Sequence, residues 1–354
     1  MNRAGQETFI MNVFRAIDRT QTAFNFLCDN PEKGDFDDEI RALGGKVFTL
    51  PMPRKRARLL YYYRYYRALV TWFKTHRDEY DAVHVHTHHN LDVLIHLKAA
   101  KRAKVKMIIH SHNTNAVHPK LSVFLRPFCN RYKATRFACS KEAGEWLFGK
   151  KAVEKGKVTV VYNGINVPDF EYDAEARRLY REELGLQDET VWGHVGRFNV
   201  QKNHQFLLRA FHEYGKLNPK SRLLLVGCGE LEGEIRAQIK RLSLEGRVML
   251  LGIRGDVNKL LNAFDYFVFP SLFEGLPVVA VEGEMNGLPF FMSDNITDEA
   301  VISENVRKLP IDDPKRWAEE IYKTAPERTV NLDYDRFDIR NTVNVLERKY
   351  RELC

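Results

Sequence analysis

The feature that most constrains the fold of this chain is a regular alternation of short apolar segments with helical patterns. Strand-like segments lie at 23–28, 46–50, 82–86, 105–110, 135–139 and 157–162. After the tetrapeptide NGIN at 163–166 the pattern restarts, with segments at 191–196, 222–227, 248–252, 266–270 and 288–293. Apolar strands separated by helices are typical of parallel sheets covered by helices on both faces. The sequence therefore predicts an α/β protein made of two doubly wound, Rossmann-like domains.

The helical patterns between these segments set the expected domain boundaries. They occur at 8–17, 57–75, 91–102, 141–148, 204–216, 231–242, 256–263, 277–286, 314–322 and 338–352. We expect an N-terminal domain over 1–165 and a C-terminal domain over 166–335. The last segment, 336–354, is expected to be a helix that crosses back to the N-terminal domain.

Cysteine usage and hydropathy indicate the compartment. The five cysteines are odd in number, scattered, and form no CxxC pair. This favours a reducing compartment and argues against a disulfide framework or a cysteine-built zinc site. No apolar run approaches the roughly 20 residues that span a bilayer. We therefore expect a cytoplasmic protein.

The net charge of +8 is concentrated in one stretch, residues 51–80. This stretch contains eight basic and two acidic residues, which gives a local charge of +6. It also includes the aromatic segments YYYRYYR and Trp72-Phe73. Basic residues with interleaved aromatic rings suit an anionic membrane surface or nucleic acid. An ordinary amphipathic helix that packs its rings on a sheet would have the same composition. Charge alone does not separate these readings.

Two glutamates in the segment FEGLPVVAVEGE, Glu274 and Glu282, point to a ligand site. Glu274 follows the strand 266–270, and ligands of open α/β sheets bind beyond the carboxyl ends of strands. Pro277 suits the first position of a helix, which places Glu282 in its second turn. A helix N-terminus with Gly275 beside it favours phosphate. A phosphate group flanked by two carboxylates that bind hydroxyls matches a nucleotide sugar, which has a sugar, a diphosphate and a ribose. The alternative interpretation is that one glutamate caps the helix and the other is solvated.

Two cations follow strand 191–196 and strengthen this interpretation. Arg197 and Lys202 both lie in the loop that leaves the strand. Two cations there can hold a diphosphate and stabilise a leaving nucleotide without a metal ion. Gly227 and Gly229 form a GxG at the next strand end, which is weak evidence alone. The alternative for the two cations is that they are solvated loop side chains.

Several of these motifs together resemble the family 4 retaining glycosyltransferases of the GT-B fold, in the branch that builds capsules and exopolysaccharides. They are VYNGIN, GRFNVQKN, LVGCGELEGEI, LLGIRGDV and FPSLFEGLPVVAVE. The resemblance implies two Rossmann-like domains that face each other across a cleft, with the donor in the C-terminal domain. It implies retaining transfer from a nucleotide sugar, with UDP as the expected nucleotide, to a lipid-linked or growing saccharide. It also implies no metal or other cofactor. The basic aromatic stretch over 51–80 would dock the N-terminal domain to the bilayer, so we expect a peripheral position on the inner face of the plasma membrane.

The resemblance assigns roles to individual residues. Glu274 would grip donor-sugar hydroxyls and Glu282 the ribose. The other donor contacts would be Arg197 and Lys202 at the diphosphate, Gly227 in the cleft, the turn around Ile253 and Arg254 at the base, and amides of Gly275 and Leu276 at phosphate.

Histidines gather at two strand ends, in VHVHTHH (83–89) and IIHSHNTN (108–115). A His-x-His pair could bind a metal ion, although we expect none. The resemblance makes one histidine after the second strand a donor-sugar contact near the reacting centre. His110 and His112 are both candidates, with His110 slightly preferred, and strand parity does not choose between them. The alternative is that they are structural.

The N-terminus departs from the family pattern. Relatives begin with an apolar strand that leads into a Gly-Gly-x-E loop, whereas this chain starts inside that loop, where Gly5 and Glu7 remain. By the resemblance, Gly5 is expected to be one of the donor-binding residues. The first strand of a doubly wound sheet is central, so its absence would leave a hole. Because the relatives' first strand is absent from the printed sequence, we expect Met1 to be an internal methionine of a product about ten residues longer. The chain as printed is expected to be poorly stable and weakly active.

Other functions were weighed against this one. A GT-B nucleotide-sugar 2-epimerase would use the same nucleotide cleft, and an inactive truncated homologue would keep the fold alone. A nucleic-acid-binding protein would not explain Glu274 and Glu282. A metal-dependent GT-A transferase needs a D-x-D at a strand end, but the two D-x-D strings, at 35–37 and 333–335, lie in polar stretches.

Overall fold

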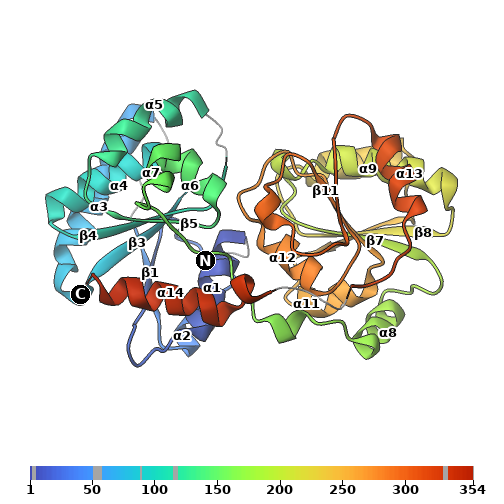
Figure 1. Cartoon of the computed structure of the whole chain (residues 1–354), viewed down its shortest axis with the longest axis horizontal. Coiled ribbons are helices and arrows are strands. Elements are labelled where there is room, and N and C mark those ends of the chain that lie inside the picture. Colours follow the sequence, from blue (N-terminus) through green and yellow to red (C-terminus); the bar gives the residue numbers. More distant parts are fainter. Residues whose placement is uncertain (2–4, 51–57, 88–89, 115–118, 330–333, 354) are drawn as a thin grey trace. The chain divides into compact units, whose positions relative to one another are not determined.

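The computed structural model describes residues 1, 5–50, 58–87, 90–114, 119–329 and 334–353. The chain divides into two compact units (Figure 1). Unit 1 comprises Met1–Gly164 and Ile339–Cys354, and unit 2 comprises Ile165–Asp338. The expected boundaries, after 165 and after 335, lie within three residues of these divisions. Both units are parallel α/β structures, as predicted.

Unit 2 contains a six-stranded parallel sheet in the order β12-β11-β10-β7-β8-β9. Its strands are β7 (Thr190–Val195), β8 (Ser221–Val226), β9 (Val248–Gly252), β10 (Tyr266–Phe269), β11 (Phe290–Ser293) and β12 (Val306–Leu309). Its helices are α8 (Ala174–Glu183), α9 (His204–Leu217), α10 (Glu232–Arg241), α11 (Val257–Leu260), α12 (Val278–Met285) and α13 (Pro314–Lys323). The strand order reverses direction between β7 and β10, which makes that position the topological switch point.

The core of unit 2 explains why its strands were easy to predict. Every residue of β10 and β11 is buried. On one face α9, α10 and α13 pack on the sheet around Trp192 and Trp317. Two elements of unit 2 were not expected. The edge strand β12 reads VRKL, and α8 is dominated by charged residues, so neither carries a strong apolar pattern.

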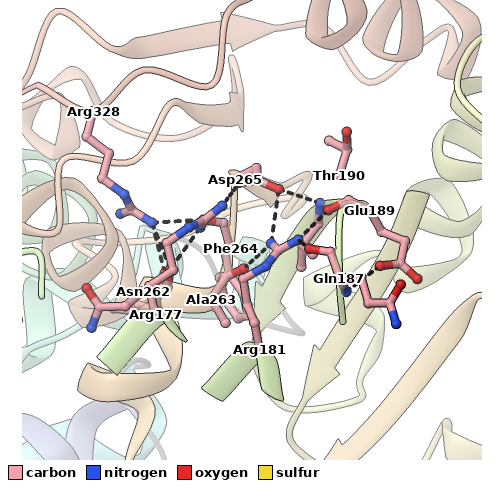
Figure 2. Close-up of polar contacts among 12 residues, drawn as sticks. Arg177, Arg181, Gln187, Glu189, Thr190, Asn262, Ala263, Phe264, Asp265 and Arg328 are labelled. Carbon is pink, nitrogen blue, oxygen red and sulfur yellow. Dashed lines mark hydrogen bonds and ion pairs between the residues drawn. The ribbon is translucent and has the colours of Figure 1, made fainter. Parts of the chain in front are cut away.

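Helix α8 is held at the amino ends of β7 and β10 by a polar network (Figure 2). Asp265 accepts from Arg177 at 2.6 Å, from Arg181 at 3.5 Å and from the backbone N–H of Val191 at 2.8 Å. Arg177 and Arg328 also donate to the carbonyl oxygen of Phe264, at 3.0 Å and 2.8 Å. The network satisfies backbone groups at the end of the sheet opposite the strands' carboxyl ends.

Unit 1 contains two separate parallel sheets, β1-β2 and β3-β4-β5-β6. The strands are β1 (Asn25–Cys28), β2 (Lys46–Thr49), β3 (Ala82–Thr87), β4 (Lys106–Ser111), β5 (Thr135–Ala138) and β6 (Thr159–Val160). The helices are α1 (Gly5–Ala16), α2 (Asp37–Ala42), α3 (Arg58–Thr75), α4 (Asn90–Ala103), α5 (Pro119–Asn130), α6 (Lys141–Phe148), α7 (Lys150–Glu154) and α14 (Ile339–Arg351). Helices α2, α5 and α7 were not expected.

The two sheets of unit 1 are flanked by helices on both faces. Figure 1 shows α3, α4, α5 and α6 above the strands and α1, α2 and α14 below them. Helix α14 packs on α1, and Tyr350 OH lies 2.8 Å from Nδ1 of His84. The last helix of the chain thus completes the fold of its first half.

Helix α3 carries the described part of the basic aromatic stretch; Arg54, Lys55 and Arg56 lie outside the described residues. Among the rings of this helix Phe73 is buried, and Trp72 is partly buried and stacks on His76 and Tyr80. Tyr63, by contrast, is 56% exposed. None of the helices in the described part of the chain is long and apolar enough to cross a bilayer.

Candidate donor-substrate site

The candidate site lies where the loops after β7 and β10 meet, at the topological switch point of unit 2. In the sheet, β7 pairs with β10 on one side and β8 on the other, so the carboxyl ends of the three strands are adjacent. The loop 196–203 leaves β7, and the loop 270–277 leaves β10. Crevices at this position bind ligands in open α/β sheets.

An ion pair joins the two loops. Nζ of Lys202 lies 2.7 Å from Oε1 of Glu274, and the two side chains are 13% and 9% exposed. The ammonium also lies 4.4 Å from the ring centroid of Phe269, the last residue of β10. A basic and an acidic side chain are therefore held side by side at the strand ends, and each provides the other with a partner in a largely buried position.

Hydrogen bonds that involve neighbouring residues fix both loops. Nε2 of Gln201 donates to the carbonyl of Phe273 at 2.8 Å, and the N–H of Leu272 donates to the carbonyl of Gln201 at 2.8 Å. The side chain of Asn203 donates to Pro270 at 3.2 Å. These contacts position Lys202 against Glu274. Gln201 and Asn203 were not predicted from the sequence, because polar loop residues carry no signal of their own.

The GxG motif is required by close packing of a third loop. Gly227 has φ of +132°, and a Cβ there would lie 2.2 Å from the carbonyl oxygen of Gly196. A Cβ on Gly229 would lie 2.4 Å from the carbonyl oxygen of Phe198. Side chains at either position would push the loop after β8 away from the loop after β7. Gly227 thus shapes the crevice by its backbone.

Arg197 shares the loop of Lys202 but has a different partner. Its guanidinium lies 3.2 Å from Glu230, and the two side chains are 65% and 55% exposed. Exposed pairs of this kind are weak and exchange readily. Arg197 is therefore free to reorient toward an anionic ligand at low cost.

Helix α12 carries two buried carboxyl groups. Glu282 is 9% exposed, and burial raises its pKa to about 7. Glu284 is fully buried, and burial raises its pKa to about 8 although its Oε2 accepts from the backbone N–H groups of Ile302 and Ser303. Glu284 was missed by the sequence analysis, and its contacts anchor the segment after β11. Glu282 lies in the second turn, as expected.

The start of α12 corrects one detail of the prediction. Pro277 was expected to be the first helical residue, but the helix begins at Val278. Pro277 has ψ of 122°, outside the helical region, and is the residue before the helix. Gly275 and Leu276 precede it, both buried, in the bend that leads from Glu274 into the helix.

The turn after β9 contains the two residues assigned to the base. The side chain of Ile253 is 51% exposed. Arg254 donates to Asp256 at 2.8 Å and to Glu183 at 3.2 Å, and these carboxylates raise the pKa of Arg254. The guanidinium is thus committed to a local cluster, whereas Ile253 offers an open apolar surface.

Two buried histidines lie next to each other near Lys202. The rings of His194, in β7, and His204, at the start of α9, have centroids 4.8 Å apart. Burial lowers the pKa of His194, and burial together with the charge of Lys202 lowers the pKa of His204 to about 3. Both rings are therefore neutral, and Lys202 is the nearby cation that helps to lower the pKa of His204. Neither histidine gave a sequence signal.

In unit 1 the histidines of β3 and β4 share one face of the sheet. His84 faces His110, with ring nitrogens 3.2 Å apart, and His86 faces His112 at 2.8 Å. His110 is fully buried, whereas His112 lies past the strand end and is half-buried. Of the two candidates, His112 is therefore the one with a surface exposed to solvent.

The same cluster has the spacing of a possible metal site. Ring nitrogens of His84, His86 and His110 lie within 4.8 Å of one another. Burial lowers the pKa of all three, to about 3 for His86. The three histidines also hydrogen-bond within the protein: His84 pairs with Tyr350 and His110, and His86 pairs with His112. A structural role in the core of unit 1 therefore explains the cluster as well as a metal site does. His88 and His89 lie outside the described residues.

Gly5 is the first residue of α1 and is exposed. A Cβ built on it would meet no atom within 4 Å. Space alone does not demand glycine here, so the expectation that Gly5 is a donor-binding residue remains a prediction.

Two family descriptions match the chain, one over each half. "Glycosyltransferase Family 4" matches residues 3–168, and "Glycosyl transferases group 1" matches residues 189–325. EpsF of Bacillus subtilis (strain 168), named as a glycosyltransferase, is 33% identical over 336 residues, which are 92% of this chain and 85% of EpsF. The capsular polysaccharide glycosyltransferase CapH of Staphylococcus aureus is 22% identical, over 99% of this chain and 96% of CapH.

A further relative and a solved structure extend the comparison. The Escherichia coli UDP-Gal:alpha-D-GlcNAc-diphosphoundecaprenol alpha-1,3-galactosyltransferase is 27% identical, over 82% of this chain and 76% of its own length. The structure of Anabaena Alr3699/HepE with UDP and glucose superimposes with a TM-score of 0.78 at 18% identity, over 98% of this chain and 96% of HepE. At that identity the likeness establishes the GT-B fold.

Proposed function

This chain belongs to glycosyltransferase family 4, and we propose that it moves a sugar from a UDP-linked donor to a lipid-linked or growing saccharide. We propose that configuration at the anomeric carbon is retained and that the product is an exopolysaccharide or capsule precursor. The observation that carries the proposal is the ion pair of Lys202 with Glu274 at the switch point. UDP bound to HepE and the diphosphoundecaprenol acceptor in the name of the Escherichia coli relative support the donor and acceptor classes.

The donor would fit the site in a single orientation. Its diphosphate would lie at Lys202 and the start of α12, and Arg197 would turn toward it. Glu274 would then accept from sugar hydroxyls and Glu282 from the ribose. The base would rest on Ile253, with amides of Gly275 and Leu276 at phosphate. In unit 1 we propose His112, rather than the buried His110, as the contact near the reacting centre.

In the proposed transfer step, the β-phosphate of the donor takes both the electrons of the broken bond and the proton of the acceptor. The bond between the anomeric carbon and the β-phosphate oxygen breaks, and its electrons leave with UDP. The acceptor hydroxyl bonds to the same face of that carbon, and its proton passes to a β-phosphate oxygen. Lys202 and Arg197 would stabilise the leaving charge, which is a role that metal ions fill in other transferases. We therefore expect EDTA to leave the transfer rate unchanged.

Calorimetric titration with UDP tests the donor site. Lys202→Met removes the charge but keeps the length of the side chain, and we expect UDP affinity to fall roughly tenfold to a hundredfold. Arg197→Ala should cost less, because its side chain is 65% exposed. Lys216→Ala, in the same unit with an exposed ion pair to Glu213, is the matched control and should bind normally. Unchanged affinity in Lys202→Met, or no binding by the folded wild type, would refute the proposed donor site.

We also propose that unit 1 rests on the anionic inner surface of the plasma membrane through α5 and α3. Helix α5 exposes four apolar side chains, Leu121 (40%), Val123 (47%), Phe124 (67%) and Phe128 (42%), and the spacing of Leu121, Phe124 and Phe128 places these three on one face. The helix has no acidic residue and contains Lys120 and Arg126. Helix α3 packs on α4, and α4 on α5, so both exposed faces belong to one helical layer. An apolar face rimmed by cations is typical of helices that lie in the membrane interface.

Co-sedimentation with vesicles tests this surface. Phe124→Asp should reduce binding to vesicles containing anionic lipid by several-fold, because it places a charge in the centre of the apolar face. Leu179→Asp, on the exposed face of α8 in unit 2, is the matched control, since Leu179 is 48% exposed. Equal loss in both variants, or equal binding to neutral vesicles, would contradict the assignment.

A further inference from the structure

Each of the two cations expected at the diphosphate already holds a glutamate. Arg197 pairs with Glu230 at 3.2 Å, and Lys202 pairs with Glu274 at 2.7 Å. The side chains of the first pair are 65% and 55% exposed, whereas those of the second are 13% and 9% exposed. Water readily replaces the partner of an exposed ion but not that of a buried one. The second pair should therefore oppose an anion that competes for its cation, and the first should not.

The lysine of the buried pair is held along its whole length. A Cβ on Gly196 would lie 3.1 Å from Cδ and Cε of Lys202, so the aliphatic stem lies against the backbone of Gly196. The ammonium lies 2.7 Å from Glu274 and 4.4 Å from the ring centroid of Phe269. The two loops that carry the pair are also joined to each other through Gln201. A phosphate at this point would therefore draw the ammonium away by rotation of the lysine side chain, while the carboxylate stays buried.

Ligands with and without a sugar differ in what they supply to Glu274. A free nucleoside diphosphate takes the ammonium and brings a negative charge, so the carboxylate exchanges a neighbouring cation for an anion. A nucleotide sugar takes the ammonium too, but its sugar hydroxyls can donate hydrogen bonds to the carboxylate in return. A buried charge that loses its counter-ion is costly, so this cost opposes binding of the free nucleotide more than binding of the nucleotide sugar.

We propose that the Lys202–Glu274 pair is a specificity determinant that disfavours UDP relative to UDP-linked sugars. The inference rests on the proposed function, because it takes the donor to be a UDP-sugar with its diphosphate at Lys202. After transfer the sugar hydroxyls leave Glu274 with the product, and the carboxylate then competes with UDP for the ammonium. The pair thus favours release of UDP and limits inhibition by it.

Titration calorimetry with UDP tests this role. Glu274→Gln keeps the size of the side chain and an acceptor oxygen but removes the negative charge that competes for Lys202. We expect UDP to bind roughly tenfold more tightly to this variant than to the wild type. Glu230→Gln is the matched control, because it removes the carboxylate from Arg197 in the same way but in an exposed pair, and it should change the affinity by less than about twofold.

Sugar nucleotides provide a second readout. UDP-glucose and UDP-galactose should gain less affinity than UDP from Glu274→Gln, because the substitution also weakens the acceptor for their hydroxyls. An equal gain for UDP and for both sugar nucleotides would mean that Glu274 only repels the nucleotide, and it would overturn the proposal.

A double variant shows whether the lysine is the object of the competition. In a Lys202→Met background, Glu274→Gln should tighten UDP binding several-fold less than it does in the wild-type background. Thermal unfolding without UDP checks that each variant is folded. If Glu274→Gln does not fold, Glu274→Asp is the second variant, since it keeps the carboxylate but draws it back from the ammonium, and it should tighten UDP binding by a smaller factor.

The outcomes separate this inference from the proposed function. A folded wild type that does not bind UDP would overturn both. UDP binding that depends on Lys202 but is unchanged or weakened in folded Glu274→Gln would overturn the inference alone, because the ammonium would then serve the carboxylate and the phosphate together.

Discussion

At the scale of single residues, the buried carboxyl of Glu282 makes the stability of unit 2 depend on pH. Burial raises its pKa to about 7, so in the folded protein it stays protonated at pH values where the unfolded chain ionises. A raised pKa stabilises the fold fully below the unfolded value of about 4.3, and this stabilisation is lost as pH rises through about 7. At pH 5, where the unfolded glutamate is already mostly ionised, we expect Glu282→Gln to be the more stable protein by only about 1 kcal/mol. At pH 8 it should be the more stable by on the order of 3 kcal/mol.

Chemical denaturation of both proteins at the two pH values checks this expectation. Glu284, whose pKa burial raises to about 8, is present in both proteins, so its own pH dependence cancels in the comparison. A stability difference that is the same at pH 5 and pH 8 would show that Glu282 is ionised throughout.

Candidate site residues could be named from the sequence where their type and position carry chemistry, and their roles remain predictions. Glu274, Lys202 and Gly227 were identified from charge or glycine at strand ends, and the structure places Lys202 against Glu274. The contacts of Gln201 and Asn203 were not predictable, because they depend on how two loops distant in sequence approach each other. The choice between His110 and His112 likewise needed the end of β4, which a pattern defines only to within a residue or two.

At the scale of elements, the attachment of α8 depends on Asp265. Its carboxylate is the shared acceptor for Arg177, Arg181 and a backbone N–H of β7, and its side chain is 12% exposed (Figure 2). Asp265→Ala leaves these donors unpaired, and we expect a loss of about 3 kcal/mol in the free energy of unfolding. Asp188→Ala, which breaks an exposed pair with Lys220, is the control and should change little. UDP affinity should be unchanged in both variants, because the network lies at the other end of the strands.

The elements themselves were predictable in proportion to their apolar content. The buried strands of unit 2 and long helices such as α3 and α9 were found close to their observed bounds. Helix α5 was missed because its apolar residues face outward, with Phe124 67% exposed, and no core period is present to detect. Helix α8 and strand β12 were missed because charge and edge position remove the apolar signal.

At the scale of the whole molecule, the two units should respond separately to truncation. Removing 339–354 deletes α14, whose Tyr350 contacts His84 and whose Thr342 donates to the carbonyl of Tyr162, all within unit 1. We expect the truncated chain to lose the unfolding transition of unit 1 at its original temperature. UDP binding by unit 2 should persist with nearly the same affinity, and a calorimetric scan with and without UDP measures both. Loss of UDP binding on truncation would mean that unit 2 does not fold alone.

The return of α14 to unit 1 also has a consequence for how the chain is made. Unit 2 is one continuous stretch, Ile165–Asp338, and all of it leaves the ribosome before α14 does. Domains usually complete their folding in the order of synthesis, N-terminal first. Here the order is reversed, because the unit that is translated first waits for the final helix. Until then the histidine face of β3 lacks Tyr350, and the nascent first half is the part that chaperones would need to shield.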